Sequence, residues 1–356
     1  MKKRKLIIIV SFFILLTIVL LYNSSRLHNQ GLYKVTFLPT LGENFTMPRA
    51  INDKGQVAGY TQYSNGDSHL FLWDKENGIR DLGLPCDGVV SLNNSGQIAS
   101  NFVDPNGNQR AFFWDPNTGR TILPTLGGKS SLAFEINNNG QIAGHSDTSS
   151  GIQHAFCWDN INGICDLTPN STSNTIASSI NDSGQVIIAD GDNILVKVQG
   201  NQILSSFPIP LSSFCRINNN GYIAGLLQNN SQTFDAAIWH PTSRQTSIIK
   251  LDAGSSAYIN KINDLNQVII TEFIRRQHFF MRNQSYVKNY NFLYDPKLGL
   301  LSLDGYIKLN KGEELGLNDI NNNGCIIGTF GSEKDMNLKG ALFEPIPEKM
   351  EQFPKK

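Results

Sequence analysis

A nine-residue motif recurs seven times along the chain, and this repetition constrains the fold more than any other feature of the sequence. Successive copies start 41, 44, 44, 37, 45 and 58 residues apart, and each begins with Ile or Leu followed by Asn. The copies are INDKGQVAG from Ile51, LNNSGQIAS from Leu92, INNNGQIAG from Ile136, INDSGQVII from Ile180, INNNGYIAG from Ile217, INDLNQVII from Ile262 and INNNGCIIG from Ile320. A period of this length predicts a row of equivalent structural units.

A second segment follows each motif. It reads HLFLWDKENGIRDLG from His69 in the first unit and HAFCWDNINGICDL from His154 in the third, and it is degenerate in the fourth unit and shorter in the seventh. All four tryptophans of the chain occupy one position of this segment, and Tyr294 takes that position in the sixth unit. The aromatic position therefore belongs to the repeat as a whole.

Each unit is predicted to contain four short strands. Asn-x-x-Gly has Asn at the first and Gly at the fourth position, as a tight turn between the first two strands prefers. The turn Asp115–Gly119 and its relatives separate the third strand from the fourth. Third-strand segments such as Phe71–Trp73 are apolar on both faces, so blades must stack to bury them. We therefore expect an all-β fold, a seven-bladed β-propeller of four-stranded blades, over residues 31–356.

The two ends of the repeat region predict how the ring closes. YKVTFLPTLG, which starts at Tyr33, matches the fourth-strand segment TILPTLG of the second unit, which starts at Thr121. The last unit has only a short fourth-strand segment near Met350. We therefore expect the N-terminal strand to complete the C-terminal blade.

The first 30 residues are expected to lie outside the propeller. Residues 1–5 form a basic stub, and residues 6–22 carry no charge. These 17 apolar residues would span about 25 Å as a helix, close to the thickness of the hydrocarbon core. Because basic residues stay cytoplasmic, we expect a transmembrane signal-anchor at 6–22, a linker at 23–30 and a propeller on the periplasmic or cell-surface side. The alternative is a cleaved signal peptide, which would release a secreted propeller.

Charge and cysteine content narrow the function classes. The chain has 30 Lys and Arg against 30 Asp and Glu, but four of the bases lie in residues 2–5, so the rest is mildly acidic. An acidic body argues against nucleic-acid binding, which needs a basic face. The five cysteines lack CxxC spacing, so neither a zinc site nor a disulfide framework is expected. Whether Cys157 and Cys165 form a disulfide across a hairpin is left undecided by the sequence.

The paired motifs resemble the bacterial HAF repeat, which is named after its His-Ala-Phe triplet. His154-Ala155-Phe156 carries the triplet, and Thr125-Leu126-Gly127-Gly128 carries the Leu-Gly-Gly turn. The resemblance covers nearly all of residues 31–345 and weakens from the fourth unit onward. It implies an extracytoplasmic repeat protein and supplies no reaction. A WD-repeat propeller is the near alternative, but the Gly-His partner of that family is missing.

The repeated polar residues are interpreted as framework. His69 and His154 share one repeat position, and Asp74, Asp115, Asp159 and Asp295 share another in the turn after the third strand, where a carboxylate accepts backbone N–H bonds. No HExxH, GxSxG, P-loop or dinucleotide motif is present. We therefore expect no catalytic residue, no metal and no cofactor.

An insertion in the sixth unit departs from the repeat and is the candidate binding surface. The segment Glu272–Tyr290 gathers basic and aromatic residues in an otherwise acidic body. As a rim hairpin it could bind an acidic polymer, a lipid surface or a partner protein; the plainer interpretation is a solvated extension. Its candidate residues are Arg275, Arg276, His278, Phe279, Phe280, Arg282 and Tyr286.

The sequence therefore predicts a membrane-tethered, extracytoplasmic propeller that binds or scaffolds a protein or glycan partner without catalysis. The alternatives are a propeller enzyme that acts on glycans or peptides and a lectin-like glycan binder. An unrepeated cluster of His, Arg and carboxylates at the channel mouth would favour the enzyme. Equivalent exposed aromatic residues on several blades would favour the lectin.

Overall fold

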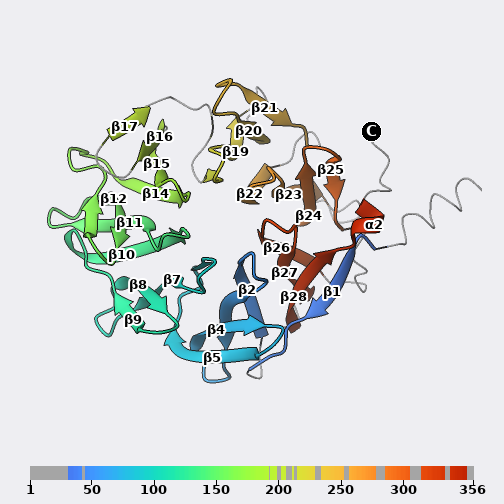
Figure 1. The fold of residues 1–356 in the computed structure, drawn as a ribbon, viewed down its shortest axis with the longest axis horizontal. Helices are drawn as coiled ribbons and strands as arrows, with labels where there is room; N and C mark the ends of the chain where they lie inside the picture. Colours follow the sequence, from blue (N-terminus) through green and yellow to red (C-terminus); the bar gives the residue numbers. More distant parts are fainter. Residues whose placement is uncertain are drawn as a thin grey trace, which may run out of the picture.

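The computed structural model describes residues 31–350 apart from 42–44, 192, 199–201, 206–210, 212–214, 229–233, 252–255, 278–284, 305–313 and 333–336. These residues form seven antiparallel sheets of four strands each, arranged as blades in a ring (Figure 1). The predicted all-β architecture of seven four-stranded blades is therefore confirmed.

The first six blades each use four consecutive strands. Blade 1 contains β2 (Phe45–Ile51), β3 (Val57–Gln62), β4 (Ser68–Asp74) and β5 (Gly78–Pro85). Blade 2 contains β6 (Val90–Leu92), β7 (Ile98–Val103), β8 (Gln109–Asp115) and β9 (Gly119–Ile122). Blade 3 contains β10 (Gly127–Ile136), β11 (Ile142–Thr148), β12 (Gln153–Asp159) and β13 (Gly163–Asp166).

The next three blades follow the same order. Blade 4 contains β14 (Thr175–Ile180), β15 (Gln185–Asp190), β16 (Asn193–Val198) and β17 (Gln202–Ser205). Blade 5 contains β18 (Arg216–Ile217), β19 (Ile223–Gln228), β20 (Phe234–Trp239) and β21 (Thr246–Ile249). Blade 6 contains β22 (Ser256–Ile262), β23 (Val268–Gln277), β24 (Ser285–Asp295) and β25 (Gly299–Ser302).

Blade 7 joins the two ends of the described chain. Its strands β26 (Glu314–Ile320), β27 (Ile326–Ser332) and β28 (Asn337–Pro345) are followed by the short helix α2 (Pro347–Met350). The fourth strand is β1 (Tyr33–Phe37), which pairs antiparallel with β28 from Tyr33 opposite Pro345 to Phe37 opposite Ala341 (Figure 1). The predicted closure of the ring by the N-terminal strand is confirmed.

Apolar side chains fill each of the seven seams between neighbouring blades. Seven separate clusters of buried residues are found, and each combines residues of two adjacent blades. In the seam that closes the ring, Phe71 and Trp73 of blade 1 pack with Ile327 and Leu342 of blade 7. The two apolar faces of the third strand are thus buried in opposite seams, as the stacking argument requires.

The Asn-x-x-Gly motif forms the predicted turn between the first two strands of a blade. The N–H of Gly55 donates to the carbonyl of Asn52 at 3.0 Å, and Gly55 has a φ of +75°. That left-handed conformation favours Gly, and in blade 6 the same turn uses Asn266, with a φ of +60°. Asn is among the few other residues that adopt this conformation readily, which explains why INDLN can replace INxxG.

Two expectations concern features outside the blades. The predicted transmembrane segment at 6–22 and the linker at 23–30 lie outside the described residues, and among the described residues no helix is long and apolar enough to cross a membrane. Cys157 and Cys165 lie opposite each other on β12 and β13, and both are free thiols.

Deleting residues 31–45 is expected to abolish cooperative folding of the whole ring. The deletion removes β1, leaves the edge of β28 unpaired and takes Leu32, Tyr33 and Leu38 out of the core. Urea unfolding of the deletion variant, followed by tryptophan fluorescence, measures the effect. A deletion of residues 23–30 is the control and should unfold like the full chain. A variant lacking 31–45 that unfolds at the same urea concentration would show that β1 does not close the ring.

Candidate functional site

The inner strands line a central channel with the residues that precede the motif: both of the two preceding residues in blades 1, 2, 3, 6 and 7, and one of them, Ser178 or Arg216, in blades 4 and 5. We call the residue directly before the Ile or Leu the first channel position and the residue before that the second channel position. In blades 1, 3, 4, 6 and 7 a β-bulge leaves the second position without a partner on the neighbouring strand, as for Arg49 between Pro48 and Ala50. A bulge turns two successive side chains toward one side. Both Arg49 and Ala50 accordingly line a channel cavity of about 220 Å³.

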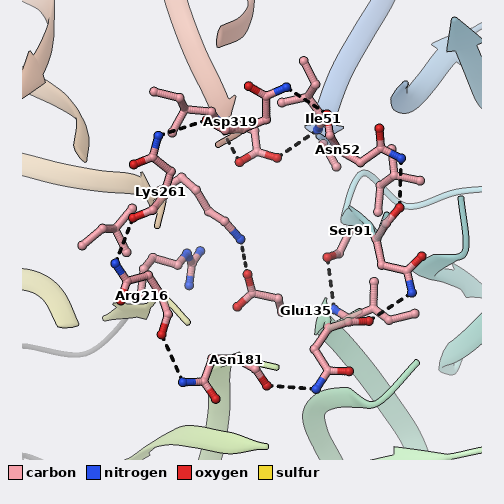
Figure 2. Close-up of a pocket in the computed structure, with 18 of the residues that line it drawn as sticks. Ile51, Asn52, Ser91, Glu135, Asn181, Arg216, Lys261 and Asp319 are labelled. Carbon is pink, nitrogen blue, oxygen red and sulfur yellow. Dashed lines mark hydrogen bonds and ion pairs between the residues drawn. The ribbon is translucent and has the colours of Figure 1, made fainter. Parts of the chain in front are cut away.

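The Asn of each motif joins its own turn to the next blade. In blade 3, the Asn137 side-chain oxygen accepts the N–H groups of Asn139 and Gln141, and its Nδ2 donates to the Gln141 side chain and to the carbonyl of Asn181. The bond to the next carbonyl recurs in all seven blades at 2.9–3.0 Å and forms a closed circle (Figure 2). The circle runs through Asn52, Asn93, Asn137, Asn181, Asn218, Asn263 and Asn321, all of them buried.

A second circle uses the residue after that Asn. The backbone N–H of this residue donates to the side-chain Oδ1 of its counterpart in the next blade, at 2.8–2.9 Å throughout. The members are Asp53, Asn94, Asn138, Asp182, Asn219, Asp264 and Asn322. Only a residue with a short side-chain oxygen can accept this bond, which explains why the position is always Asn or Asp. Three carboxylates therefore surround this mouth of the channel, which we call the turn-side mouth.

The first channel position links blades in a third way, but only in four of them. There a side-chain oxygen accepts the N–H of the motif Ile in the next blade, as Asp319 does for Ile51 at 2.9 Å (Figure 2). Ser91, Glu135 and Ser179 make the same bond to Ile136, Ile180 and Ile217. The other three blades have Ala50, Arg216 and Lys261 at this position, and none of these side chains offers an acceptor. At two of these positions a cationic side chain, Arg216 or Lys261, therefore replaces the residue that accepts the N–H of the next blade in four other units.

One of these cations crosses the channel. Lys261 of blade 6 reaches Glu135 of blade 3, and the two side chains form an ion pair near the centre of the ring (Figure 2). Burial opposes ionisation of both groups, but their mutual attraction lowers the pKa of Glu135 and raises that of Lys261. Glu135 also accepts the Ser179 hydroxyl and the Ile180 N–H. The pair is therefore a charged bridge across the channel.

The nearby carboxyl of Asp319 is held differently. Burial raises its pKa to about 6, and the positive charge of Lys261 together with the N–H groups of Ile51 and Ile320 only partly offsets this effect. Glu135 adds to the rise through like-charge repulsion. Asp319 therefore changes charge in the range where proteins usually work.

The second channel position adds a further departure from the repeat. Asn260 and Asn318 donate to the carbonyls of Leu317 and Pro48 in the following blades. Blade 1 has Arg49 instead, and blade 3 has Phe134. Arg49, Arg216 and Lys261 thus form an unrepeated set of cations around the channel, together with Glu135 and Asp319.

Sequence reasoning missed this cluster. The five charged residues come from five different blades, so no local spacing brings them together. The available signal was the first channel position itself, which reads Ala, Ser, Glu, Ser, Arg, Lys and Asp while the next two positions are nearly invariant. A position that varies from blade to blade within an otherwise regular repeat identifies residues that the framework does not require.

The predicted binding insertion is only partly described. Strands β23 and β24 form a long hairpin in which Arg275 pairs with Val287 and Arg276 with Tyr286. His278, Phe279, Phe280 and Arg282 lie outside the described residues. The proposed binding surface therefore stays a prediction.

The residues interpreted as framework do serve the framework. His154 contacts the Asp166 carboxylate at 2.8 Å and the Ser171 carbonyl at 3.1 Å, and His69 contacts Asp81 in the same way. The Asp159 carboxylate accepts the N–H groups of Ile161 and Asn162, which follow it in the turn. The His of His-Ala-Phe and the Asp of Asp-Leu thus tie the third strand to the fourth.

Neither a lectin pattern nor a metal site emerges from the described residues. The tryptophans at the repeated aromatic position are buried or half-buried in the seams and are not exposed. Within 31–350, gaps excepted, no three His, Cys, Asp or Glu side chains are grouped as metal ligands.

Comparisons with known proteins support the fold. No family model matches the chain, and no curated protein matches it. The β-propeller domain of the Trilobed protease from Pyrococcus furiosus, described as having an open velcro topology, is 8% identical over 84% of this chain and 92% of that chain, with a TM-score of 0.56. YCF48 bound to D1 peptide is 12% identical over 88% of this chain and 95% of that chain, with a TM-score of 0.46. At this identity the first likeness shows a β-propeller fold alone, and here β1 closes the last blade.

Replacing Asn137 by Ala is expected to destabilise the propeller by about 2–4 kcal/mol, because it leaves buried donors and acceptors in two blades unpaired. Asn139→Ala in the same turn is the matched control. It removes one bond from an exposed side chain to the Asp182 carbonyl and should cost less than about 1 kcal/mol. Urea unfolding of both full-length variants measures the difference, and equal losses would contradict a structural role for the Asn circle.

Proposed function

We propose that the protein is a membrane-tethered, extracytoplasmic propeller of the HAF-repeat type that binds a ligand through its central channel without catalysing a reaction. The tether and its orientation rest on the basic residues 2–5 and the uncharged stretch 6–22. The repeat type rests on the His-Ala-Phe and Leu-Gly-Gly segments.

The observation that carries the binding role is the replacement of linking residues by cations in the channel. Ser, Glu and Asp at the first channel position each stabilise the next blade by one hydrogen bond, and Arg216 and Lys261 give that bond up. Placing positive charge in a half-buried channel costs free energy unless something there uses it. Glu135 already uses the charge of Lys261, and the carbonyls of Ser178 and Asn260 use part of Arg216. Among the described residues the Arg216 guanidinium has no carboxylate in an ion pair with it, so its remaining donors are available to a ligand.

The absence of catalysis is supported by the state of the two channel carboxylates. Glu135 is held ionised by Lys261 and already accepts two further hydrogen bonds. Asp319 accepts two backbone N–H groups. Both carboxylates are buried, and each of their oxygens already accepts a hydrogen bond from the protein, so a substrate proton would have to compete with these partners.

A propeller enzyme acting on glycans or peptides is the second candidate. It is favoured by the unrepeated cluster itself and by the pKa of Asp319 near 6, which suits a group that exchanges protons at neutral pH. Turnover therefore has to be measured alongside binding.

The tether predicts that the full-length chain stays with the membrane fraction after an alkaline carbonate wash. A variant in which residues 6–22 are deleted should lose this association because no apolar span remains. Protease added outside intact cells, or outside spheroplasts of a two-membrane bacterium, should digest the propeller of the full-length protein. An uncleaved chain recovered in the soluble fraction would contradict the anchor, whereas a soluble chain shortened at its N-terminus would favour a cleaved signal.

Ligand binding is tested by screening glycan fragments and short peptides against the full-length chain in detergent. A ligand that binds the folded protein raises its unfolding temperature. We expect peptide or glycan hits that mass spectrometry recovers uncleaved, and a shift that is lost in Arg216→Gln but kept in Arg80→Gln, an exposed Arg on β5. Cleaved hits would favour the enzyme. A shift lost only in Arg275→Gln/Arg276→Gln would place the binding surface on the insertion.

A further inference from the structure

The end of the channel away from the turns holds a second cavity of about 270 Å³. Its lining includes residues two to four positions before the motif Ile, such as Arg49, Phe134, Ile176 and Tyr258, so it lies deeper along the inner strands than the Asn circles. We call it the strand-side cavity.

Two arginines line the strand-side cavity, and their donors are largely unused. Arg49 Nη2 donates to the Tyr60 hydroxyl at 3.3 Å, whereas its buried Nε has no acceptor among the described residues. Arg216 donates to the carbonyls of Ser178 and Asn260 at 3.0 and 3.4 Å. In the described part of the chain neither guanidinium forms an ion pair with a carboxylate. Each guanidinium has five N–H groups, so both retain donors for a ligand.

The remaining wall of the cavity is largely apolar. Val89, Phe134, Ile176 and Tyr258 contribute to it, and the Tyr258 side chain is 40% exposed. The bulge in β10 is what turns Phe134 inward beside Glu135. A ligand that fits this wall has an apolar part next to its charged group.

Charge is distributed unevenly along the channel. Among the described residues that line the strand-side cavity there is no carboxylate, whereas Asp53, Asp182 and Asp264 surround the turn-side mouth. Glu135, whose charge interacts with that of Arg216, is already bridged to Lys261. An anion is therefore attracted to the strand-side cavity and repelled from the opposite mouth.

We infer that the strand-side cavity binds an organic carboxylate attached to an apolar group, with Arg49 and Arg216 holding the carboxylate. This inference rests on the proposed channel-binding function and names its ligand class. A carboxylate matches the fork of a guanidinium with two parallel hydrogen bonds. The apolar wall favours it over a free phosphate, which would lose its hydration there without compensation. The cavity volume of about 270 Å³ leaves space for a residue-sized group.

The test is a calorimetric titration of the full-length chain in detergent with matched acids and amides. The probes are 3-phenylpropanoate and 3-phenylpropanamide, the peptide acetyl-Gly-Gly-Phe with a free or an amidated C-terminus, and inorganic phosphate. We expect each acid to bind at least 10-fold more tightly than its amide, because hydrogen bonds between two charged groups are stronger than those to a neutral amide. A peptide that binds more tightly than 3-phenylpropanoate identifies a chain end as the source of the carboxylate, and equal affinities identify a small free acid.

Variants locate the site. Arg49→Gln and Arg216→Gln should each weaken binding of the acids at least 10-fold and leave the amides unchanged, whereas Arg80→Gln should change neither. Arg216→Gln loses the bonds to Ser178 and Asn260, so its unfolding temperature is measured as well. If that temperature falls, the binding loss of Arg49→Gln decides the test, since the Arg49 guanidinium makes one long hydrogen bond to the Tyr60 hydroxyl and lies 5.5 Å from the Tyr60 ring centroid.

The outcomes separate this inference from the proposed function. Acid and amide binding with equal affinity, or phosphate competing as well as the acids, would overturn the carboxylate assignment while leaving channel binding intact. If none of these probes and no member of the glycan and peptide screen binds, the proposed function and this inference fail together.

Discussion

A hydrogen bond from one Asn side chain to the backbone carbonyl of the next Asn, repeated around the ring, sets the position of every blade relative to its neighbours. The same side chain closes the turn of its own blade, so turn geometry and blade spacing depend on one residue. Donor and acceptor belong to the same repeat position, and therefore the circle has no free end. An open row of seven units would lack one of these seven hydrogen bonds, because the last Asn side chain and the first Asn carbonyl would have no neighbouring blade. The pairing of β1 with β28 and the circle of Asn hydrogen bonds therefore both stabilise a closed ring of seven blades.

The charged side chains of the channel lie at repeat positions that are not required to hold the blades together. Once the motif Asn and the residue after it hold the blades together, the first channel position can vary, and Arg216 and Lys261 show that it does. The result is a channel with acidic residues at one mouth, a charged bridge in the middle and two arginines with apolar neighbours at the other end. Such a gradient gives a long ligand only one favourable orientation in the channel.

The sequence predicted the parts of this protein that recur and missed the part that does not. The turn at Asn52, the strands that flank it and the pairing of β1 with β28 follow from patterns that are visible within 50 residues or at the chain ends. The bulges were not predictable in this way. Side chains alternate along a regular strand, so without a bulge only one of Arg49 and Ala50 would point into the channel. No local sequence pattern predicted the extra residue of the bulge. Glu135 and Lys261 are 126 residues apart and meet only because the ring closes.

Closure by the first strand also determines when the fold can be completed. Tyr33 pairs with Pro345, 312 residues later, so β1 has no partner until the chain has been made as far as β28. At about 5–20 residues per second this wait lasts roughly 15–60 s. During that time β1 exposes a free edge and the apolar side chains of Leu32, Tyr33 and Leu38, which finally lie in the core. The most vulnerable period of this protein is therefore its own synthesis, when a folding helper that covers the N-terminal strand would protect it from aggregation.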